Sequence, residues 1–210
     1  MSPYRKRLLF YVLGLILCGF ILLTAFISIF PESVIDREFS EEVQEHQHPT
    51  LDWLMKIVSS VGVFPYSVVM VLITALIFLF AKYKKEALYI CFTLVSGVVS
   101  ASLKILINRP RPEESVVRII EKAKNNSFPS GHVLFYVLFF GFLALLMYHV
   151  KTIPKTLRIV VGGIALFMVF TVPVSRVYLG AHWFTDVLGG FMLGMLCLLI
   201  LSYQYLKKPN

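Results

Sequence analysis

Six long apolar stretches constrain the fold of this chain more than any other feature of its sequence. Their approximate bounds are residues 8–30, 61–81, 86–107, 131–149, 159–178 and 186–206. Each is close to the roughly 20 apolar residues that a helix needs to cross the hydrocarbon core of a membrane. The sequence therefore predicts an all-α polytopic membrane protein, with six transmembrane helices in a single domain that spans residues 1–210.

The composition agrees with a membrane protein, because 58% of the residues are hydrophobic, whereas soluble domains contain about 45–50%. The first stretch follows basic residues and could be confused with a secretory signal peptide. It is longer than the apolar part of such a peptide, and Phe30-Pro31-Glu32 lacks the small residues of a cleavage site, so we expect a retained helix. Cys18, Cys91 and Cys197 lie within apolar stretches, and we expect them to form neither a disulfide nor a metal centre.

Basic residues near the ends of the apolar stretches indicate the orientation in the membrane. They form four groups, which are Arg5 to Arg7, Lys82 to Lys85, Lys151 to Arg158, and Lys207-Lys208. Cytoplasmic loops of membrane proteins are enriched in Lys and Arg, so we predict that these groups and both termini are cytoplasmic. The net charge of +8 is divided among separate groups and forms no single basic stripe, which argues against nucleic acid as a partner.

The segment from Glu32 to Asp52 separates the first two apolar stretches and contains seven acidic residues. Its composition favours a solvated acidic loop, and a short external or interfacial helix is the alternative. His46 and His48 in this segment receive no functional assignment. Trp53, which follows the segment, is predicted to anchor the chain at the membrane interface, where aromatic side chains are enriched.

Three polar clusters interrupt the apolar stretches. They are Lys104 with Arg111-Pro112, then Pro129-Ser130-Gly131-His132, and finally Ser175-Arg176 with His182 and Asp186. If both termini are cytoplasmic, all three clusters fall at the external ends of predicted helices. Ionisable side chains are costly at membrane depth and are therefore functional candidates. We predict an active site at the external membrane interface.

The residue types in these clusters suit the transfer of a phosphoryl group. Negative charge is spread over the oxygens of such a group, so catalysis depends on fixed cations and hydrogen-bond donors. Lys104, Arg111 and Arg176 supply three cations. The hydroxyl group of Ser130 and the backbone amides at Gly131 supply donors at a helix N-terminus, where anions are favoured, and glycine lets the backbone approach a ligand closely. We predict that these five residues bind phosphate.

Two histidines and one aspartate are predicted to carry out the reaction. Asp186 follows His182 by four residues, which places both on one face of a helix. A carboxylate on one nitrogen of an imidazole leaves the other nitrogen free to attack. We therefore predict His182 as the nucleophile and Asp186 as the residue that orients it. His132 would protonate the leaving group and then, as a base, activate the water that releases phosphate.

Each of these residues also has a structural interpretation when it is considered alone. Lys104 could extend to the membrane surface, Arg111 could belong to an ordinary loop, and Asp186 could place a negative charge at a helix N-terminus. The joint occurrence of these residue types, at these spacings and on one side of the membrane, favours catalysis over the separate structural roles.

Taken together, the three clusters resemble the tripartite signature of the type 2 phosphatidic acid phosphatase superfamily, and every position of that signature is matched. The resemblance implies hydrolysis of a lipid phosphate through a phosphohistidine, with no metal or other cofactor. It does not separate phosphatidylglycerophosphate, phosphatidate and polyprenyl diphosphate as substrates. The short chain and small loops resemble bacterial members, which implies a cytoplasmic (inner) membrane location.

Two further functions remain open on the sequence alone. Transfer of the phosphoryl group from a lipid to an acceptor other than water would use the same residues. A non-catalytic lipid-binding protein is the other alternative, although such a protein would be expected to lose its catalytic residues. The loop residues Arg118, Lys122 and Lys124 would suit a polyanionic headgroup, whereas the role of Arg109 and the oligomeric state are not predicted.

Overall fold

Helices make up all the regular secondary structure in the computed structural model, which describes residues 3–123 and 125–207. Lys124 of the predicted basic loop and Lys208 of the predicted C-terminal basic group lie outside these residues. In chain order the helices are α1 (Pro3–Ile29), α2 (Val34–Gln44), α3 (Pro49–Ser60), α4 (Tyr66–Phe80), α5 (Lys84–Phe92), α6 (Val95–Ile107), α7 (Gly131–His149), α8 (Lys155–Tyr178) and α9 (Phe184–Leu206). The prediction of an all-α fold is confirmed.

Five segments of the described chain are long and apolar enough to cross a membrane, and they correspond to five of the six predicted stretches. They are Lys6–Ile29, Lys84–Ile107, Gly131–His149, Lys155–Tyr178 and Phe184–Leu206. The second segment contains α5 and α6 in succession, with a short turn at Thr93 and Leu94 between them. The chain is therefore a polytopic membrane protein.

The remaining predicted stretch, residues 61–81, is helical only over α4. This helix has 15 residues and a length of about 22 Å, which is less than the roughly 30 Å of a hydrocarbon core. Before it the chain turns, because the N–H groups of Gly62 and Val63 donate to carbonyl oxygens only three residues back. Pro65, at the N-cap of α4, has no N–H group with which to continue an earlier helix.

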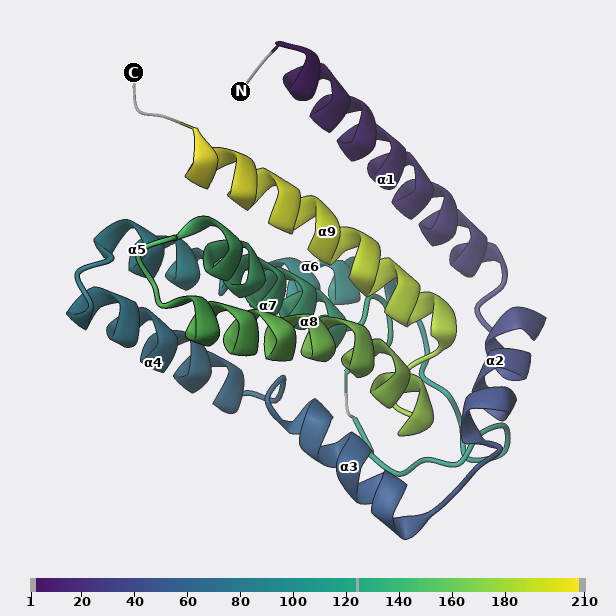
Figure 1. Cartoon of the computed structure of the whole chain (residues 1–210). Helices are drawn as coiled ribbons and strands as arrows, with labels where there is room; N and C mark the ends of the chain where they lie inside the picture. Colours follow the sequence, from purple (N-terminus) through teal and green to yellow (C-terminus); the bar gives the residue numbers. More distant parts are fainter. Residues whose placement is uncertain (1–2, 124, 208–210) are drawn as a thin grey trace.

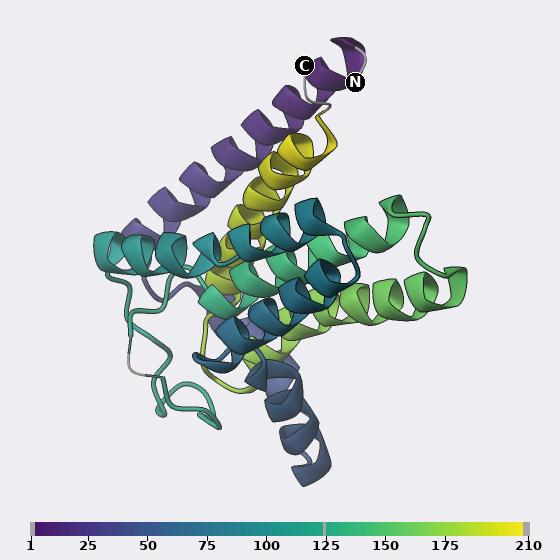
Figure 2. The ribbon, with the colours of Figure 1, turned by 90° about the vertical axis from the view of Figure 1, so that its left-hand side faces the viewer.

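The central element of the bundle is α7, which packs against α5, α6, α8 and α9. All its residues from Val133 to Phe140 are buried, so it lacks the exposed polar face of a surface helix. At the edge of the bundle, α1 packs along α9 (Figure 1), and the turned view in Figure 2 shows the same pairing. The start of α1 and the end of α9 lie at the same end of the bundle (Figure 1).

The prediction of a solvated acidic loop between Glu32 and Asp52 is wrong, because the segment forms α2 and the start of α3. The hydroxyl oxygen of Ser33 accepts a hydrogen bond from the N–H group of Asp36 at 3.2 Å and so caps α2. Its buried face consists of Asp36, Ser40 and Gln44, and its exposed face carries Glu38, Glu41, Glu42 and Glu45. A short helix, the alternative interpretation, is therefore what the segment forms, and its buried side is polar.

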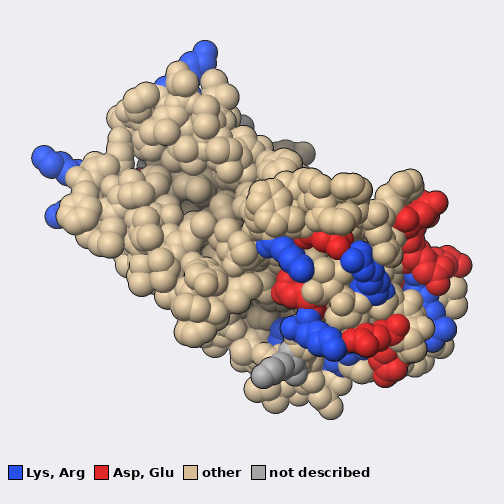
Figure 3. Space-filling view, turned by 90° about the horizontal axis from the view of Figure 1, so that it is seen from below, with Lys and Arg blue, Asp and Glu red and all other residues tan. Residues whose placement is uncertain are grey.

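The end of the bundle opposite the termini contains α2, α3 and the connections from α6 to α7 and from α8 to α9 (Figure 1). Gln44 joins α2 to the connection after α6 and to the last residue of α8. Its Nε2 donates to the carbonyl oxygens of Arg118 and Tyr178, both at 2.8 Å, and its Oε1 accepts from the N–H group of Arg118 at 3.0 Å. Seen from below, acidic and basic side chains gather together, and the neighbouring surface is nearly free of charge (Figure 3). We call this part the polar end of the molecule.

Gly190 of α9 tests the close packing at the polar end. A Cβ at this position would lie 2.6 Å from the carbonyl oxygen of Ser130. We expect Gly190→Ala to lower the free energy of unfolding by about 1–3 kcal/mol, because a clash with backbone cannot be relieved by a change of rotamer. Gly163 of α8 is the matched control, since nothing lies within 4 Å of a Cβ built there. Thermal unfolding in one detergent measures both variants, and equal stability would contradict the packing.

Candidate active site

The three predicted polar clusters meet at the polar end. Lys104 lies in the last turn of α6, Ser130 at the N-cap of α7, and Arg176 in the last turn of α8. Asp186 lies in the first turn of α9. The N–H group of Ser130 donates to the carbonyl oxygen of Asp186 at 3.0 Å. The fold thus ties the second cluster directly to the third.

The buried carboxylate of Asp186 is held by several donors. Its Oδ2 accepts from the N–H group of Trp183 at 2.9 Å and from the hydroxyl group of Ser127, and its Oδ1 accepts from Arg109 Nη1 at 2.7 Å. The Nδ1 atom of His182 lies 3.5 Å from Oδ2, slightly beyond the usual range of a hydrogen bond. The imidazole therefore faces a carboxylate that other groups already fix in position.

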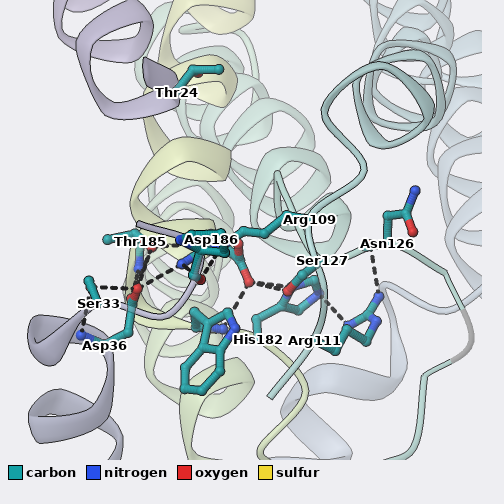
Figure 4. A network of polar contacts seen from close by, with 12 residues as sticks. Thr24, Ser33, Asp36, Arg109, Arg111, Asn126, Ser127, His182, Thr185 and Asp186 are labelled. Carbon is teal, nitrogen blue, oxygen red and sulfur yellow. Dashed lines mark hydrogen bonds and ion pairs between the residues drawn. The ribbon is translucent and has the colours of Figure 1, made fainter. Parts of the chain in front are cut away.

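The imidazole of His182 lies between this carboxylate and a cation. Its Nε2 atom is 3.3 Å from Nη1 of Arg111, while Nδ1 faces Asp186 (Figure 4). The side chain is only 2% exposed. Burial, together with the positive charges of Arg111, Arg176 and Lys104, lowers the pKa of His182 well below its ordinary value. The ring is therefore unprotonated at neutral pH, as a nucleophile must be.

Lys104 and Arg111, the two cations of the first cluster, both donate hydrogen bonds to the backbone of residues 125–127, and Arg111 also donates to the backbone of Ala181. The ammonium group of Lys104 donates to the carbonyl oxygens of Asn126 and, at 3.3 Å, of Ser127. The guanidinium group of Arg111 donates to the carbonyl oxygens of Asn125 and Ala181. Burial and then the nearby charge of Arg176 lower the pKa of Arg111 to about 10, so it stays positively charged at neutral pH.

Arg176 has an acidic partner that the sequence did not indicate. Its Nη1 atom donates to both carboxylate oxygens of Glu121 at 3.0 Å, and also to the hydroxyl group of Ser59. The guanidinium group is 1% exposed, and the Glu121 side chain is 29% exposed. A carboxylate and a phosphate bind arginine through similar hydrogen bonds. Glu121 therefore takes up N–H donors of Arg176 that are predicted to bind phosphate.

Several polar atoms at this place have no hydrogen-bond partner. In the described part of the chain, the buried side-chain atoms of this kind are Ser130 Oγ, His132 Nε2, Arg176 Nε, His182 Nδ1, Trp183 Nε1 and Ser202 Oγ. Four of these six atoms belong to residues predicted for the site. Buried polar groups are nearly always paired, so this concentration is typical of a site that binds a polar ligand.

Two glycines set the packing around His132. A Cβ on Gly131 would lie 2.7 Å from the hydroxyl oxygen of Ser100, so this glycine lets α7 approach α6. The sequence predicted instead that Gly131 allows the backbone to approach a ligand. Gly62, in the turn before α4, was not singled out from the sequence. A Cβ there would lie 2.3 Å from Cδ2 of His132, so the ring occupies the space that a side chain would fill.

A cavity of about 330 Å³ opens beside the site, between α4, α6 and α7. Lys104, Gly131 and His132 form part of its lining. Its remaining walls include the apolar residues Phe64, Val68, Leu94, Ala101 and Phe135. The cavity therefore joins predicted catalytic and phosphate-binding residues to the apolar side of the bundle.

Arg109 does not face Lys104, Arg111 or Arg176, the cations that are predicted to bind phosphate. Its side chain is 1% exposed and forms ion pairs with both Asp36 and Asp186, each at 2.7 Å. Sequence reasoning missed this arrangement because Asp36 lies 73 residues away from Arg109 among several other acidic residues. The only available signal was the position of Arg109 within the first cluster, at the end of an apolar stretch.

The predicted basic loop is mostly neutralised by its neighbours. Arg118 forms an ion pair with Asp52 at 2.7 Å, and Lys122 forms one with Glu114 at 2.8 Å. The third residue, Lys124, lies outside the described part of the chain. These pairs leave less free positive charge for a polyanionic headgroup than the sequence predicted.

The chain is similar to a known protein family and to several known proteins. Residues 85–209 match the family model of the PAP2 superfamily. The chain is 30% identical to phosphatidylglycerophosphatase B of Bacillus subtilis (strain 168) over 184 residues, which are 84% of this chain and 86% of that protein. It is also 30% identical to the undecaprenyl-diphosphatase of Sulfolobus acidocaldarius over 161 residues, which are 75% of this chain and 72% of that protein.

A solved structure agrees with these sequence matches. The crystal structure of a transmembrane PAP2 type phosphatidylglycerolphosphate phosphatase from Bacillus subtilis is similar at a TM-score of 0.79 and 25% identity, covering 95% of this chain and 100% of that chain. Fold and site together define a helical membrane protein with a buried cluster of polar residues. The chain belongs to the PAP2 superfamily and is a membrane lipid phosphatase. The predicted family and enzyme class are confirmed.

The ion pair between Glu121 and Arg176 gives a testable expectation for anion binding. A phosphate that binds Arg176 must displace a carboxylate, so we expect Glu121→Gln to strengthen inhibition by inorganic phosphate. An exposed ion pair contributes about 0.2–1 kcal/mol, and Arg176 is only 1% exposed, so we expect an inhibition constant that is lower by about fivefold or more.

The matched control for this measurement is Glu114→Gln, which makes the same chemical change in the same loop at a carboxylate paired with the exposed Lys122. Its inhibition constant should equal that of the unaltered protein. An inhibition constant for Glu121→Gln that is unchanged, or higher, would show that Glu121 does not compete with anions.

Proposed function

We propose that this protein removes a phosphate group from a membrane lipid through a phosphohistidine at His182. The observation that carries the proposal is the group of unpartnered buried atoms Ser130 Oγ, His132 Nε2 and Arg176 Nε beside an imidazole that is unprotonated at neutral pH. Such atoms suit the oxygens of a phosphoryl group and of its leaving group. The proposal involves no metal or other cofactor.

In the first step, the Nε2 atom of His182 attacks phosphorus, and the bond from phosphorus to the lipid oxygen breaks. His132 donates a proton to the departing oxygen. Arg111 lies 3.3 Å from the attacking nitrogen and, with Lys104 and Arg176, balances the negative charge of the phosphoryl oxygens. The product of this step is a phosphohistidine and a dephosphorylated lipid or, from a diphosphate, a lipid monophosphate.

In the second step, water attacks phosphorus while His132 removes its proton. The phosphorus–nitrogen bond breaks, inorganic phosphate leaves, and His182 regains its lone pair. The phosphorylated ring carries positive charge, and Asp186 at 3.5 Å from Nδ1 stabilises it. Dividing one displacement into two steps is the usual advantage of a covalent intermediate.

The cavity between α4, α6 and α7 supports a lipid as the substrate. A lipid lying in the membrane would place its headgroup at Lys104 and His132 and its chain along the apolar walls of the cavity. Two relatives are named as a phosphatidylglycerophosphatase and an undecaprenyl-diphosphatase. Phosphatidylglycerophosphate, phosphatidate and polyprenyl diphosphate therefore remain the candidate substrates.

The orientation that we propose places the active site outside the cytoplasm and both termini inside it. Because α7 begins at the site and α8 ends there, the connection with Lys151 and Lys155 lies at the far ends of these helices. The connection with Lys82 and Lys84 lies at the far ends of α4 and α5. These basic loops would face the cytoplasm of a bacterial cell. In this orientation α4, although its 15 residues are shorter than the hydrocarbon core, returns the chain to the cytoplasmic side.

Substitution of the two histidines tests the two-step mechanism. His182→Ala should abolish both turnover and the acid-labile phosphoenzyme formed from a ³²P-labelled lipid phosphate, because no nucleophile remains. His132→Ala should retain His182 but form the phosphoenzyme more slowly by roughly 10²–10⁴-fold, the usual contribution of a general acid. Labelling that persists in His182→Ala would assign the nucleophile to another residue.

Filling the cavity tests the proposed binding of the lipid chain. Ala101 lines the cavity on α6, and Ala101→Phe should raise the Michaelis constant for long-chain lipid phosphates about tenfold or more, because the added ring occupies the space of a chain. Hydrolysis of a short-chain, soluble phosphate ester by the same variant is the control and should change little. Equal effects on both substrates would place the lipid chain elsewhere.

A further inference from the structure

Behind His182, on the side away from Arg111, lies a layer of buried polar residues that the proposed reaction does not use directly. It consists of Asp36 from α2, Arg109 from the connection after α6, and Thr185 from α9 (Figure 4). The side chains of Asp36 and Arg109 are 0% and 1% exposed. These three residues link the acidic helix α2 to Asp186, the residue that faces the proposed nucleophile.

Arg109 has no N–H group available for a substrate. Its Nε and Nη2 atoms donate to the carbonyl oxygen of Pro31 at 3.0 and 2.8 Å, and Nη2 also donates to Asp36 at 2.7 Å. Its Nη1 atom donates to Thr185 Oγ1 at 2.6 Å and to Asp186 Oδ1 at 2.7 Å. A guanidinium group has five N–H donors, and all five are used, so its plane is fixed relative to Asp186.

Asp36 fixes the start of α9 from the opposite side. Its Oδ1 atom accepts from the backbone N–H of Thr185 at 2.9 Å and from the Thr185 hydroxyl group, also at 2.9 Å. The hydroxyl group of Ser33 donates to Oδ2 at 2.8 Å. Because Thr185 immediately precedes Asp186, these contacts hold the backbone from which the Asp186 side chain projects.

The charges of this group do not cancel. Asp36 and Asp186 each carry a negative charge, whereas Arg109 supplies a single positive charge between them. A buried group whose only purpose was to join helices would be expected to be neutral, since uncompensated buried charge is costly. Arg111 lies on the other side of His182, 3.3 Å from Nε2, so the Nδ1 side of the ring, 3.5 Å from Asp186, faces this net negative group when phosphorylation makes the ring cationic.

We propose that Asp36 and Arg109 are positioning residues of the phosphatase reaction. Arg109 holds Asp186 ionised, both residues keep Asp186 directed at Nδ1 of His182, and the net negative charge of the three residues favours the cationic phosphohistidine over the neutral ring. The inference rests on the proposed function, because it concerns the intermediate of that reaction. It assigns a catalytic purpose to α2, which contributes no residue to the three signature clusters.

Asp36→Asn tests this inference while preserving the shape of the side chain and an oxygen that can accept from Thr185. The turnover number should fall by roughly 10–100-fold, the range expected when a catalytic group is misplaced or loses its charge partner. The Michaelis constant should change by less than about twofold, because the substrate does not contact Asp36. Single-turnover formation of the ³²P-phosphoenzyme should slow by the same factor as turnover.

Arg37→Gln is the matched charge control on the same helix. Arg37 pairs with Glu32 at the surface, with side chains 50% and 36% exposed, and its substitution should leave turnover unchanged. The rate of each variant is divided by its concentration of folded protein, and thermal unfolding of each sample determines that concentration. A merely structural role for Asp36 would lower the folded fraction and leave the rate per folded protein as it was.

Thr185 provides a second variant that changes no charge, in case Asp36→Asn does not fold. Thr185→Val removes the hydroxyl group that joins Asp36 to Arg109 and should lower the turnover number several-fold, whereas Thr185→Ser keeps that group and should restore nearly normal turnover. Normal rates per folded protein in both Asp36→Asn and Thr185→Val would overturn the inference alone. An unaltered protein that forms no phosphoenzyme would overturn the proposed function and this inference with it.

Discussion

The hydrogen bonds made by Asp186 are the interactions on which the polar end of this protein depends. Its carboxylate accepts from Ser127, Trp183 and Arg109, and its backbone carbonyl accepts from the N–H group of Ser130. These contacts join the connection after α6 to the first turns of α7 and α9. A charged group can be buried in this way only when its lone pairs are satisfied. The contacts that make the fold possible therefore also set the geometry around His182.

Lys104, Arg111 and Arg176 satisfy the same requirement in a different way. All three are largely enclosed by protein, and each donates to an oxygen atom of the chain itself: Lys104 and Arg111 to backbone carbonyl groups and Arg176 to Glu121. A buried cation needs such acceptors to be tolerated. Under the proposed function, binding of phosphate by these groups is an exchange of one set of oxygen atoms for another. Affinity depends on how weakly the chain holds its own cations.

The apolar stretches and the three polar clusters could be predicted from sequence because both are local patterns. Five stretches form helices long enough to cross a membrane, and the clusters meet where these helices end. The packing of α2 could not be predicted in this way, since its apolar residues Ile35 and Phe39, spaced as in a helix, are exposed, whereas its buried face consists of Asp36, Ser40 and Gln44. Arg109 and Glu121 were missed for a related reason. Their partners are remote in sequence, and the position of Arg109 between Lys104 and Arg111 does not reveal which acidic residues it contacts.

Gly62 and His132 meet across the turn that precedes α4. The glycine leaves just enough room for the imidazole, because an added Cβ would lie 2.3 Å from the ring. The turn itself holds none of the residues assigned to phosphate or to proton transfer. Any side chain introduced there would nevertheless re-orient His132, the proposed proton donor. Directed-evolution libraries that seek activity on esters with poorer leaving groups thus have a compact target in this turn, outside the motifs by which such enzymes are recognised.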